Sequence, residues 1–258
     1  MKVLITRPRA QAADFAEQLR QAGFEPILFP VIEIRPVENN AALETALANL
    51  EKYAWLIFTS VNAVPPTVSP HFLRKWGESP AGTRGVKIAA VGPKTAAALR
   101  QRNIEPDFIP DEFRGEAIFA GLGDLRGKWI LLPRAELARP ELPAAIAAAG
   151  GIAHEIIVYR TLPAEIDSAG LAALKSGVDV ITFTSASCVE NFVEIARQNQ
   201  LDPLHLPNAP KIACIGPVTG QAARAAGFEN VVVAKEFTSE GLVAQVSDLR
   251  GKSEICPT

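Results

Sequence analysis

The 258-residue sequence is poor in several features that mark particular classes of protein. Its three cysteines, Cys188, Cys214 and Cys256, lack CxxC or zinc spacing, which predicts a reduced protein without a cysteine metal site. No apolar run reaches the ~18 residues of a membrane helix, and the opening MKVLITRPRA is too weakly apolar for a signal peptide. The net charge of −2, without long runs of one sign, argues against a nucleic-acid or membrane surface. These absences favour a cytoplasmic globular protein.

Common catalytic motifs are missing as well. His71, His154 and His205 have no cysteine or carboxylate at ligand spacing, and we expect surface or boundary positions for them. GLGDLRG (121–127) has the wrong spacing for a dinucleotide motif, and VGPKT (91–95) lacks the ending of a P-loop. Neither a Ser-His-Asp nor an HExxH pattern is visible. The sequence therefore predicts chemistry without a metal, a cofactor or an obvious nucleophile.

The sequence does contain an internal repeat. IFTSVNAV (57–64) matches ITFTSASCV (181–189), with the threonines of the FTS motifs 125 residues apart. IAAVGPKTAAAL (88–99) and EFRGEAIFAGLGDLRGK (112–128) recur 124 residues later as IACIGPVTGQAA and EFTSEGLVAQVSDLRGK. KVLITRPRA (2–10) pairs more weakly with KWILLPRAE (128–136). A long, ordered repeat of this kind predicts two similar structural units.

Each half alternates strand-like and helix-like segments. Residues 3–6 resemble a strand, residues 10–22 have apolar positions on one helical face, and PILFPVIEI (26–34) resembles a second strand. This alternation predicts an α/β fold with parallel sheets covered by helices. A simple partition would cut the chain near residue 126. However, the extended segments at 30–37 and 155–162 have the β-branched character of strands that connect domains.

The FTS and GPxT turns are the best candidates for a binding site. In open parallel sheets, ligands bind beyond the carboxyl ends of strands, where helix N-termini point and attract anions. Thr59 or Ser60 can cap the helix that follows, and Pro93 suits a first helical position. Such turns also occur in α/β proteins simply to begin helices, and duplication of a fold duplicates them. Tyr159 has a similar ambiguity, because aromatic residues are ordinary in strands.

Seven segments in register resemble the uroporphyrinogen-III synthase family over nearly the whole chain. They are LITRP (4–8), FTSVNAV (58–64), AVGPKTAAAL (90–99), LLPRAE (131–136), IIVYRT (156–161), FTSAS (183–187) and IACIGPVTGQAA (212–223). The resemblance implies two flavodoxin-like α/β domains joined by a two-stranded ribbon, with the cleft between them. One domain would comprise residues 1–35 and 162–258, and the other residues 36–161, with linker strands at about 30–37 and 155–162.

The resemblance also implies a cofactor-free lyase. The expected substrate is hydroxymethylbilane, a linear tetrapyrrole with an acetate and a propionate on each ring. The enzyme would close it with loss of water and inversion of ring D to give uroporphyrinogen III. The implied catalytic residue is Tyr159, as a hydrogen-bond donor to the leaving hydroxyl. The implied substrate-binding residues are Ser60, Val61, Asn62, Gly92, Ser185, Ala186, Thr219, Arg7 and Arg134.

Three points stay open at this stage. Pro65, Pro66 and Pro70 stand where the family has a regular helix, so the prolines either start that helix late or replace its first turn, and the role of Asn62 depends on which of these holds. A binding protein that closes on a small polyanion without changing it, or another polycarboxylate lyase, would share many of these features. We expect a monomer with only a transient contact to the upstream hydroxymethylbilane synthase.

Overall fold

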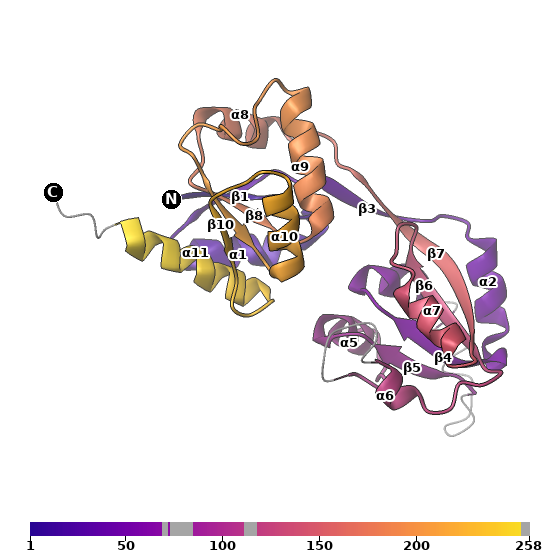
Figure 1. The fold of residues 1–258 in the computed structure, drawn as a ribbon. Coiled ribbons are helices and arrows are strands. Elements are labelled where there is room, and N and C mark those ends of the chain that lie inside the picture. The colour runs from indigo at the N-terminus through magenta and orange to yellow at the C-terminus, as the bar shows by residue number, and fades with distance from the viewer. Residues whose placement is uncertain (69–71, 73–84, 111–117, 254–258) are drawn as a thin grey trace. The chain divides into compact units, whose positions relative to one another are not determined.

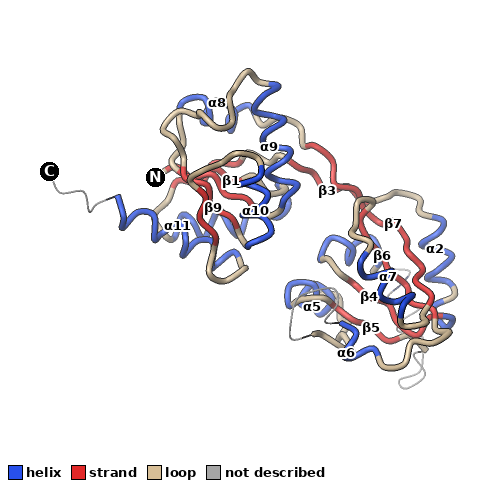
Figure 2. Tube along the Cα trace, viewed as in Figure 1, coloured by secondary structure: helices blue, strands red, loops and turns tan. Residues whose placement is uncertain are grey.

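The computed structural model describes residues 1–68, 72, 85–110 and 118–253 (Figures 1 and 2). The chain divides into two compact units. Unit 1 comprises Met1–Glu33 and Leu162–Thr258, and unit 2 comprises Ile34–Thr161. Within the described residues, no helix is both long and apolar enough to cross a membrane.

Unit 1 contains a five-stranded parallel sheet. Its strands are β1 (Lys2–Ile5), β2 (Glu25–Leu28), β8 (Val180–Phe183), β9 (Lys211–Cys214) and β10 (Val231–Val233), in the order β10-β9-β8-β1-β2. Two buried threonines tie β1 to β8, because Thr6 Oγ1 donates to the carbonyl of Thr182 (2.7 Å) and Thr182 Oγ1 donates to that of Leu4 (2.8 Å). The first strand of the chain is thus held by one nearly 180 residues later.

Helices cover both faces of this sheet. They are α1 (Ala13–Gln21), α8 (Ser168–Ser176), α9 (Ala186–Gln198), α10 (Pro217–Ala225) and α11 (Ser239–Ser253), with a 3-10 turn η1 (Arg9–Gln11) before α1. Alternate residues of a strand point to opposite faces. Accordingly, Val3 and Ile5 join the cluster under α1 and α11, whereas Leu4 joins the one under α8, α9 and α10 (Figure 1).

Unit 2 repeats this plan with shorter helices. Its strands are β3 (Ile32–Pro36), β4 (Tyr53–Phe58), β5 (Lys87–Ala90), β6 (Trp129–Ala135) and β7 (Ile152–Pro163), in the order β3-β7-β6-β4-β5. Strands β7, β6, β4 and β5 run parallel. The helical segments are α2 (Ala41–Ala48), η2 (Leu50–Lys52), η3 (Val61–Ala63), α3 (Val64–Thr67), α5 (Pro93–Arg100), α6 (Phe119–Leu122) and α7 (Glu141–Ala148).

The chain passes between the units through two neighbouring strands. The unit boundaries fall inside β3 and near the end of β7, and these strands are adjacent in the sheet. The amide of Val37 donates to the carbonyl of Val158 (3.0 Å) just beyond β3. The predicted α/β fold with two parallel-sheet units and a two-stranded ribbon is therefore present.

One strand prediction is wrong. The segment 26–34, expected as a single strand, forms β2 and β3 in two different sheets. The interruption contains Pro30, which has no amide hydrogen to donate to a ladder. On either side of it, the amides of Phe29 and Val31 still bond to Ile5 and Thr6, in unit 1. A break at a proline let the chain leave one sheet and enter the next.

Candidate functional site

The same pair of turns lies at the carboxyl edge of each sheet. In unit 2, β4 leads to Ser60 and its neighbour β5 leads to Gly92. In unit 1, β8 leads to Ser185 and its neighbour β9 leads to Gly216. Because neighbouring strands run parallel, both turns of a unit lie at one edge.

A backbone hydrogen bond joins the two turns in each unit. The amide of Val91 donates to the carbonyl of Phe58 (2.8 Å), and that of Ile215 donates to Phe183 (2.9 Å). The two amides are 124 residues apart and the two carbonyls 125 residues apart, which are the offsets of the sequence repeat. The repeated sequence therefore builds a repeated local geometry.

Serine side chains cap both FTS turns. Ser60 Oγ accepts from the amide of Asn62, and Ser185 Oγ accepts from that of Cys188, each at 3.2 Å. Both serines have extended backbones, as N-cap residues do. The predicted cap is confirmed at Ser60, whereas Thr59 is exposed. Since the amide of Asn62 is already used by this cap, it has less to offer to a ligand.

The helices that follow these caps differ. Helix α9 has 13 residues, whereas Ser60 is followed by the three-residue turn η3 and the four-residue helix α3. Pro65 and Pro66 occupy the start of α3. Proline lacks an amide hydrogen and is tolerated only in a first helical turn, so the helix begins late, as one of the two expected alternatives had it. Pro70 lies outside the described residues.

Several amides at these turns have no acceptor in the described part of the chain. They belong to Val61, Thr95, Ala186, Ser187, Val218 and Thr219. Gly92 and Gly216 are the N-cap residues of α5 and α10 and have no side chain to cap them. Open amides at a helix N-terminus favour an anion by about 0.3–1 kcal/mol when exposed, and up to ~2 kcal/mol when partly buried. Each unit thus presents two turns suited to carboxylates.

Arg7 follows β1 at the same edge of unit 1. Its side chain is 8% exposed and its guanidinium stacks on Phe15, 4.2 Å from the ring centroid. Arg7 Nη1 donates to Ser239 Oγ (3.2 Å), whereas the buried Nε has no partner. Burial lowers the pKa of Arg7 to about 10, so the group is still charged at neutral pH. No carboxylate of the described residues lies within ion-pair distance of this buried cation, although the charge of Glu240 acts on it and raises its pKa against the effect of burial.

Arg134, the expected counterpart of Arg7, is already paired. It lies on β6 and contacts the carboxylate of Glu155 and the carbonyl of Arg139. The Arg134 side chain is 10% exposed, and that of Glu155 is 46% exposed. To bind a substrate carboxylate, Arg134 would have to leave Glu155. The two arginines predicted as equivalent therefore differ in whether their guanidinium groups are available to a substrate carboxylate.

Tyr159 lies on β7 opposite Ala135, the last residue of β6. This register places Tyr159 at the same carboxyl edge of the unit 2 sheet as the FTS and GPxT turns. The residue is 7% exposed and belongs to the core cluster against which the partly buried Ile34 packs. Its hydroxyl forms no hydrogen bond within the described chain. The ring of Tyr159 is buried but its hydroxyl oxygen is not, so the hydroxyl is open to an external hydrogen-bond partner.

Other titratable groups do not gather at these turns. No group of three or more His, Cys, Asp or Glu residues in the described ranges could hold a metal ion. Cys188 and Cys214 are free and buried, and burial raises the pKa of the Cys214 thiol to about 12. His154 bonds to Tyr53 at the opposite end of the unit 2 strands. His71 and Cys256 lie outside the described residues.

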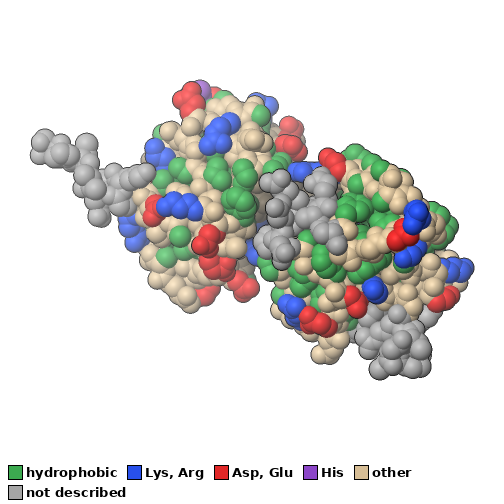
Figure 3. Space-filling view, turned by 60° about the horizontal axis from the view of Figure 1, so that its bottom comes forward, with side chains coloured by type: hydrophobic (Ala, Val, Ile, Leu, Met, Phe, Trp, Pro, Cys, Tyr) green, Lys and Arg blue, Asp and Glu red, His purple; other side chains and the backbone are tan. Residues whose placement is uncertain are grey.

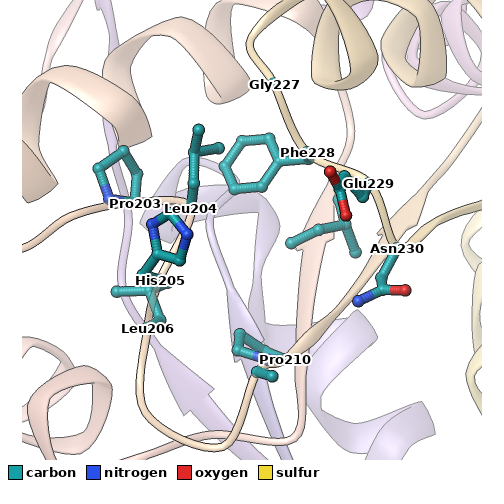
Figure 4. Close-up of a pocket in the computed structure, with 11 residues that line it drawn as sticks. Pro203, Leu204, His205, Leu206, Pro210, Gly227, Phe228, Glu229 and Asn230 are labelled. Atoms are coloured by element: carbon teal, nitrogen blue, oxygen red, sulfur yellow. The ribbon is translucent and has the colours of Figure 1, made fainter.

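A pocket of ≈ 210 Å³ opens at the opposite edge of the unit 1 sheet (Figure 4). It is formed by the loops that precede β9 and β10, and includes Leu204, His205, Phe228 and Glu229. His205 is exposed and bonds to Asp202 (2.7 Å), as expected for a surface histidine. Within unit 1, this pocket is thus separated from the turns at Ser185 and Gly216 by the length of the strands.

Charges of both signs are interspersed on the face shown in Figure 3. This distribution agrees with the small net charge of −2. Attraction of an anionic ligand would therefore come from local groups, such as Arg7 and the open amides, rather than from a long-range field.

Sequence reasoning missed Ser239 and Phe237. Ser239 begins α11 and contacts Arg7, and Phe237 is 63% exposed just before that helix. The repeat contained a signal for them, since Glu-Phe stands at 112–113 and again at 236–237. That pair indicates duplication, but nothing in the sequence alone joins it to the turns.

Comparison with known proteins agrees with this architecture. The family model described as "Uroporphyrinogen-III synthase HemD" matches residues 13–244. A uroporphyrinogen-III synthase of Synechococcus elongatus is 32% identical over 251 residues, covering 95% of this chain and 93% of that protein. One of Chlorobaculum parvum is 28% identical, covering 95% and 98%. A porphyrin biosynthesis protein of Ruminiclostridium josui is 28% identical over 97% of this chain, which spans only 49% of that longer protein.

Solved structures share the fold. A mutant uroporphyrinogen III synthase of Thermus thermophilus has a TM-score of 0.65 at 22% identity, with 98% of this chain and 99% of that chain covered. The Helicobacter pylori enzyme has a TM-score of 0.61 at 21% identity, with 96% and 99% covered. Together with the match of the family model over most of the sequence, these relatives show that the chain belongs to the uroporphyrinogen-III synthase family.

Proposed function

We propose that this protein closes hydroxymethylbilane to uroporphyrinogen III, with loss of water and inversion of ring D. Membership of the family makes it a cyclising lyase of tetrapyrrole biosynthesis. The observation that carries the proposal is the repeated pair of turns with open amides, together with the unpaired cation of Arg7. A substrate with eight carboxylates needs many such groups, and duplication supplies two sets.

The binding residues fall into two sets. In unit 2, Ser60, Val61, Asn62 and Gly92 would bind substrate carboxylates through their turns. In unit 1, Arg7, Ser185, Ala186 and Thr219 would do so. We assign Arg134 a smaller part in binding, because Glu155 and a backbone carbonyl already occupy its guanidinium. Fixing the carboxylates would hold the flexible chain in one folded form, which is the main requirement for attack by the correct carbon.

Tyr159 would act at the leaving hydroxyl. The electron pair of the adjacent pyrrole nitrogen expels the hydroxyl group, and the tyrosine hydroxyl donates a hydrogen bond to that oxygen as it leaves. The substituted carbon of ring D then attacks the cationic methylene carbon. The bond from that ring D carbon to the methylene bridge of ring C breaks, the freed bridge carbon bonds to the unsubstituted carbon of ring D, and that carbon loses its proton, which balances the loss of water. Expulsion by the pyrrole nitrogen requires no strong protein acid, so a phenol suffices as the hydrogen-bond donor. The absence of a hydrogen-bond partner within the described chain supports this role.

An isomer assay tests the proposal. Hydroxymethylbilane is generated in situ, the purified protein is added, and the products are oxidised and separated as uroporphyrin isomers. We expect the III isomer to predominate. Only the spontaneous, uninverted I isomer, obtained with folded protein, would favour the alternative of a binding protein that closes on a polyanion without changing it.

We also propose that the protein is a cytoplasmic monomer that contacts hydroxymethylbilane synthase only transiently. The two described cysteines are free, which suits a reducing compartment. A transient contact would shorten the time during which the substrate can close without inversion. Light scattering of the purified protein, alone and mixed with the upstream enzyme, tests both the monomer and the contact.

A further inference from the structure

Phe237 is an exposed aromatic ring beside one of the candidate turns. Its side chain is 63% exposed, just before α11. A Cβ atom placed on Gly216, the N-cap residue of α10, would lie 3.6 Å from the Phe237 ring. Single exposed apolar residues are common on proteins, so the exposure alone does not define a site. What distinguishes Phe237 is that its ring lies beside the GPVT turn.

The buried guanidinium of Arg7 lies beside the same loop. Two residues after Phe237, Ser239 Oγ accepts a hydrogen bond from Arg7 Nη1 (3.2 Å). The Arg7 side chain is more than nine-tenths buried and its Nε has no partner. A buried, unpaired polar group of this kind is costly. A carboxylate brought to this place by a ligand would satisfy it.

The loop that carries Phe237 is held firmly at the start of α11. Thr238 Oγ1 accepts from the amide of Gly241 (3.0 Å), and the carbonyl of Thr238 accepts from Leu242 (3.1 Å). Gly241 packs so closely on this loop that an added Cβ would lie 2.2 Å from the carbonyl oxygen of Glu236. The exposed ring therefore stands on a fixed support rather than at a loose end.

The sequence repeat supplies an independent argument. Phe113 stands 124 residues before Phe237, in the same Glu-Phe pair. Residue 113 lies outside the described residues, so the argument rests on its place in the sequence alone. The FTS and GPxT turns recur at nearly the same offset. An aromatic residue is thus repeated together with the turns proposed to bind carboxylates.

We propose that Phe237 stacks on one pyrrole ring of the substrate while Arg7 and Ser239 hold a carboxylate of that ring. The inference rests on the proposed function and adds a positioning residue to it. A pyrrole of this substrate combines a flat aromatic face with an acetate and a propionate at its edge. An exposed phenyl ring beside an unpaired guanidinium complements both parts.

Three variants of Phe237 and one control test the inference. They are Phe237→Ala, Phe237→Leu, Phe237→Tyr and Leu204→Ala, the last at an exposed position in the pocket on the opposite edge of the sheet. Stacking stabilises the bound substrate and the transition state equally, so its loss should raise KM and leave kcat unchanged. We expect KM for hydroxymethylbilane to rise about 5- to 10-fold in Phe237→Ala and by about half that factor in Phe237→Leu. Phe237→Tyr and Leu204→Ala should stay near the wild-type value.

Equilibrium binding of uroporphyrinogen III, measured anaerobically by calorimetry, separates this inference from the proposed function. A wild type that binds this compound but never forms it would contradict the proposed function, while weaker binding by Phe237→Ala would still support the inference. Wild-type KM and binding in a folded Phe237→Ala protein would overturn the inference. The inference would also be overturned if Phe237→Ala and Phe237→Leu weakened binding equally and Phe237→Tyr weakened it as well. Binding would then not depend on an aromatic face at this position.

Discussion

The two units of this protein share their turns but not the helices that follow. Ser60 and Ser185 make equivalent caps, and the two turns of each unit are joined by equivalent hydrogen bonds. Yet Ser185 begins a helix of 13 residues, and Ser60 begins a three-residue 3-10 turn followed by a four-residue helix. The electrostatic effect of a helix end is confined to its first turn. A shortened helix can therefore keep the ability to bind an anion, provided that its opening turn is intact.

The second difference concerns the GPxT turns. Gly92 has φ +93° and ψ 156°, a conformation open essentially to glycine alone, whereas Gly216 has φ −164°, which any residue adopts. The same residue thus has different reasons to be present. At position 92 the backbone requires glycine. At position 216 neither the backbone nor the contact with Phe237 requires glycine, since an added Cβ would lie 3.6 Å from that ring.

The largest change in activity is expected at Tyr159, a position where the two halves of the repeat differ. Tyr159 stands 125 residues after Ile34, which has no hydroxyl. We expect Tyr159→Phe to lower kcat about 10- to 100-fold, because the donor to the leaving oxygen is lost. The fold should persist, since the described chain makes no hydrogen bond to this hydroxyl. Isomer-resolved kinetics measure kcat, and a thermal melt tests whether the fold persists.

Tyr53→Phe is the matched control for that variant. Tyr53 Oη lies 2.6 Å from His154 Nδ1, at the amino end of β4. Its loss should reduce the free energy of unfolding by about 0.5–1.5 kcal/mol and leave kcat unchanged. Equal kcat values in the wild type and Tyr159→Phe would remove Tyr159 from the mechanism.

The next largest change in KM is expected at Arg7, in contrast to Arg134. Arg7→Met should raise KM about tenfold, through loss of a charge-assisted contact with a carboxylate. Because burial lowers the pKa of Arg7, the folded state holds this charge at a cost. The free energy of unfolding should therefore stay the same or rise by about 1–2 kcal/mol. Urea denaturation alongside kinetics checks the two parts separately.

Arg134→Met should behave differently. We expect KM within about twofold of the wild type and a loss of stability of at most ~1 kcal/mol, because Glu155 is half exposed and can be solvated. If Arg134→Met raised KM more than Arg7→Met, the distinction between a paired and an unpaired arginine would be wrong.

A third prediction compares the two glycines through stability alone. Gly92→Ala should lower the free energy of unfolding by about 1–3 kcal/mol, because alanine is strained at φ +93°. Gly216→Ala should change it by less than about 0.5 kcal/mol, since the added Cβ would make an ordinary contact with Phe237 at 3.6 Å. Urea denaturation measures both, and equal losses would contradict this account of the backbone.

The smallest effects are expected at the two caps. Ser185→Ala should cost about 1 kcal/mol of stability, and Ser60→Ala about half of that, because Ser60 begins a shorter helical segment. Ser185→Asp is the informative control. It restores a cap acceptor, so stability should return, but its negative charge beside the open amides should raise KM. Wild-type stability together with a wild-type KM in Ser185→Asp would argue against carboxylate binding at this turn.

The sequence predicted the features that depend on pattern and missed those that depend on three-dimensional neighbours. Strand and helix alternation, the repeat and the cap at Ser60 are local or periodic, and they were read correctly. The break at Pro30 was missed because an apolar β-branched run looks the same in one sheet or two. The pairing of Arg134 with Glu155 arises from neighbouring strands 21 residues apart, and the contact of Arg7 with Ser239 spans 232 residues. No periodicity indicates such pairs.

The crossing of the chain through β3 and β7 has a consequence for synthesis. Unit 2 is continuous from Ile34 to Thr161, so all of its strands but the end of β7 have been made before unit 1 resumes. Strand β1 must wait for β8, its neighbour across the sheet at residues 180–183. At roughly 5–20 residues per second, that wait lasts on the order of 10–35 s. Until then β1 can pair with β2 but has no strand on its other side. The apolar side chains of β1 and α1 are therefore incompletely covered, and a chaperone that shields short amino-terminal segments would be of most use to this protein in that interval.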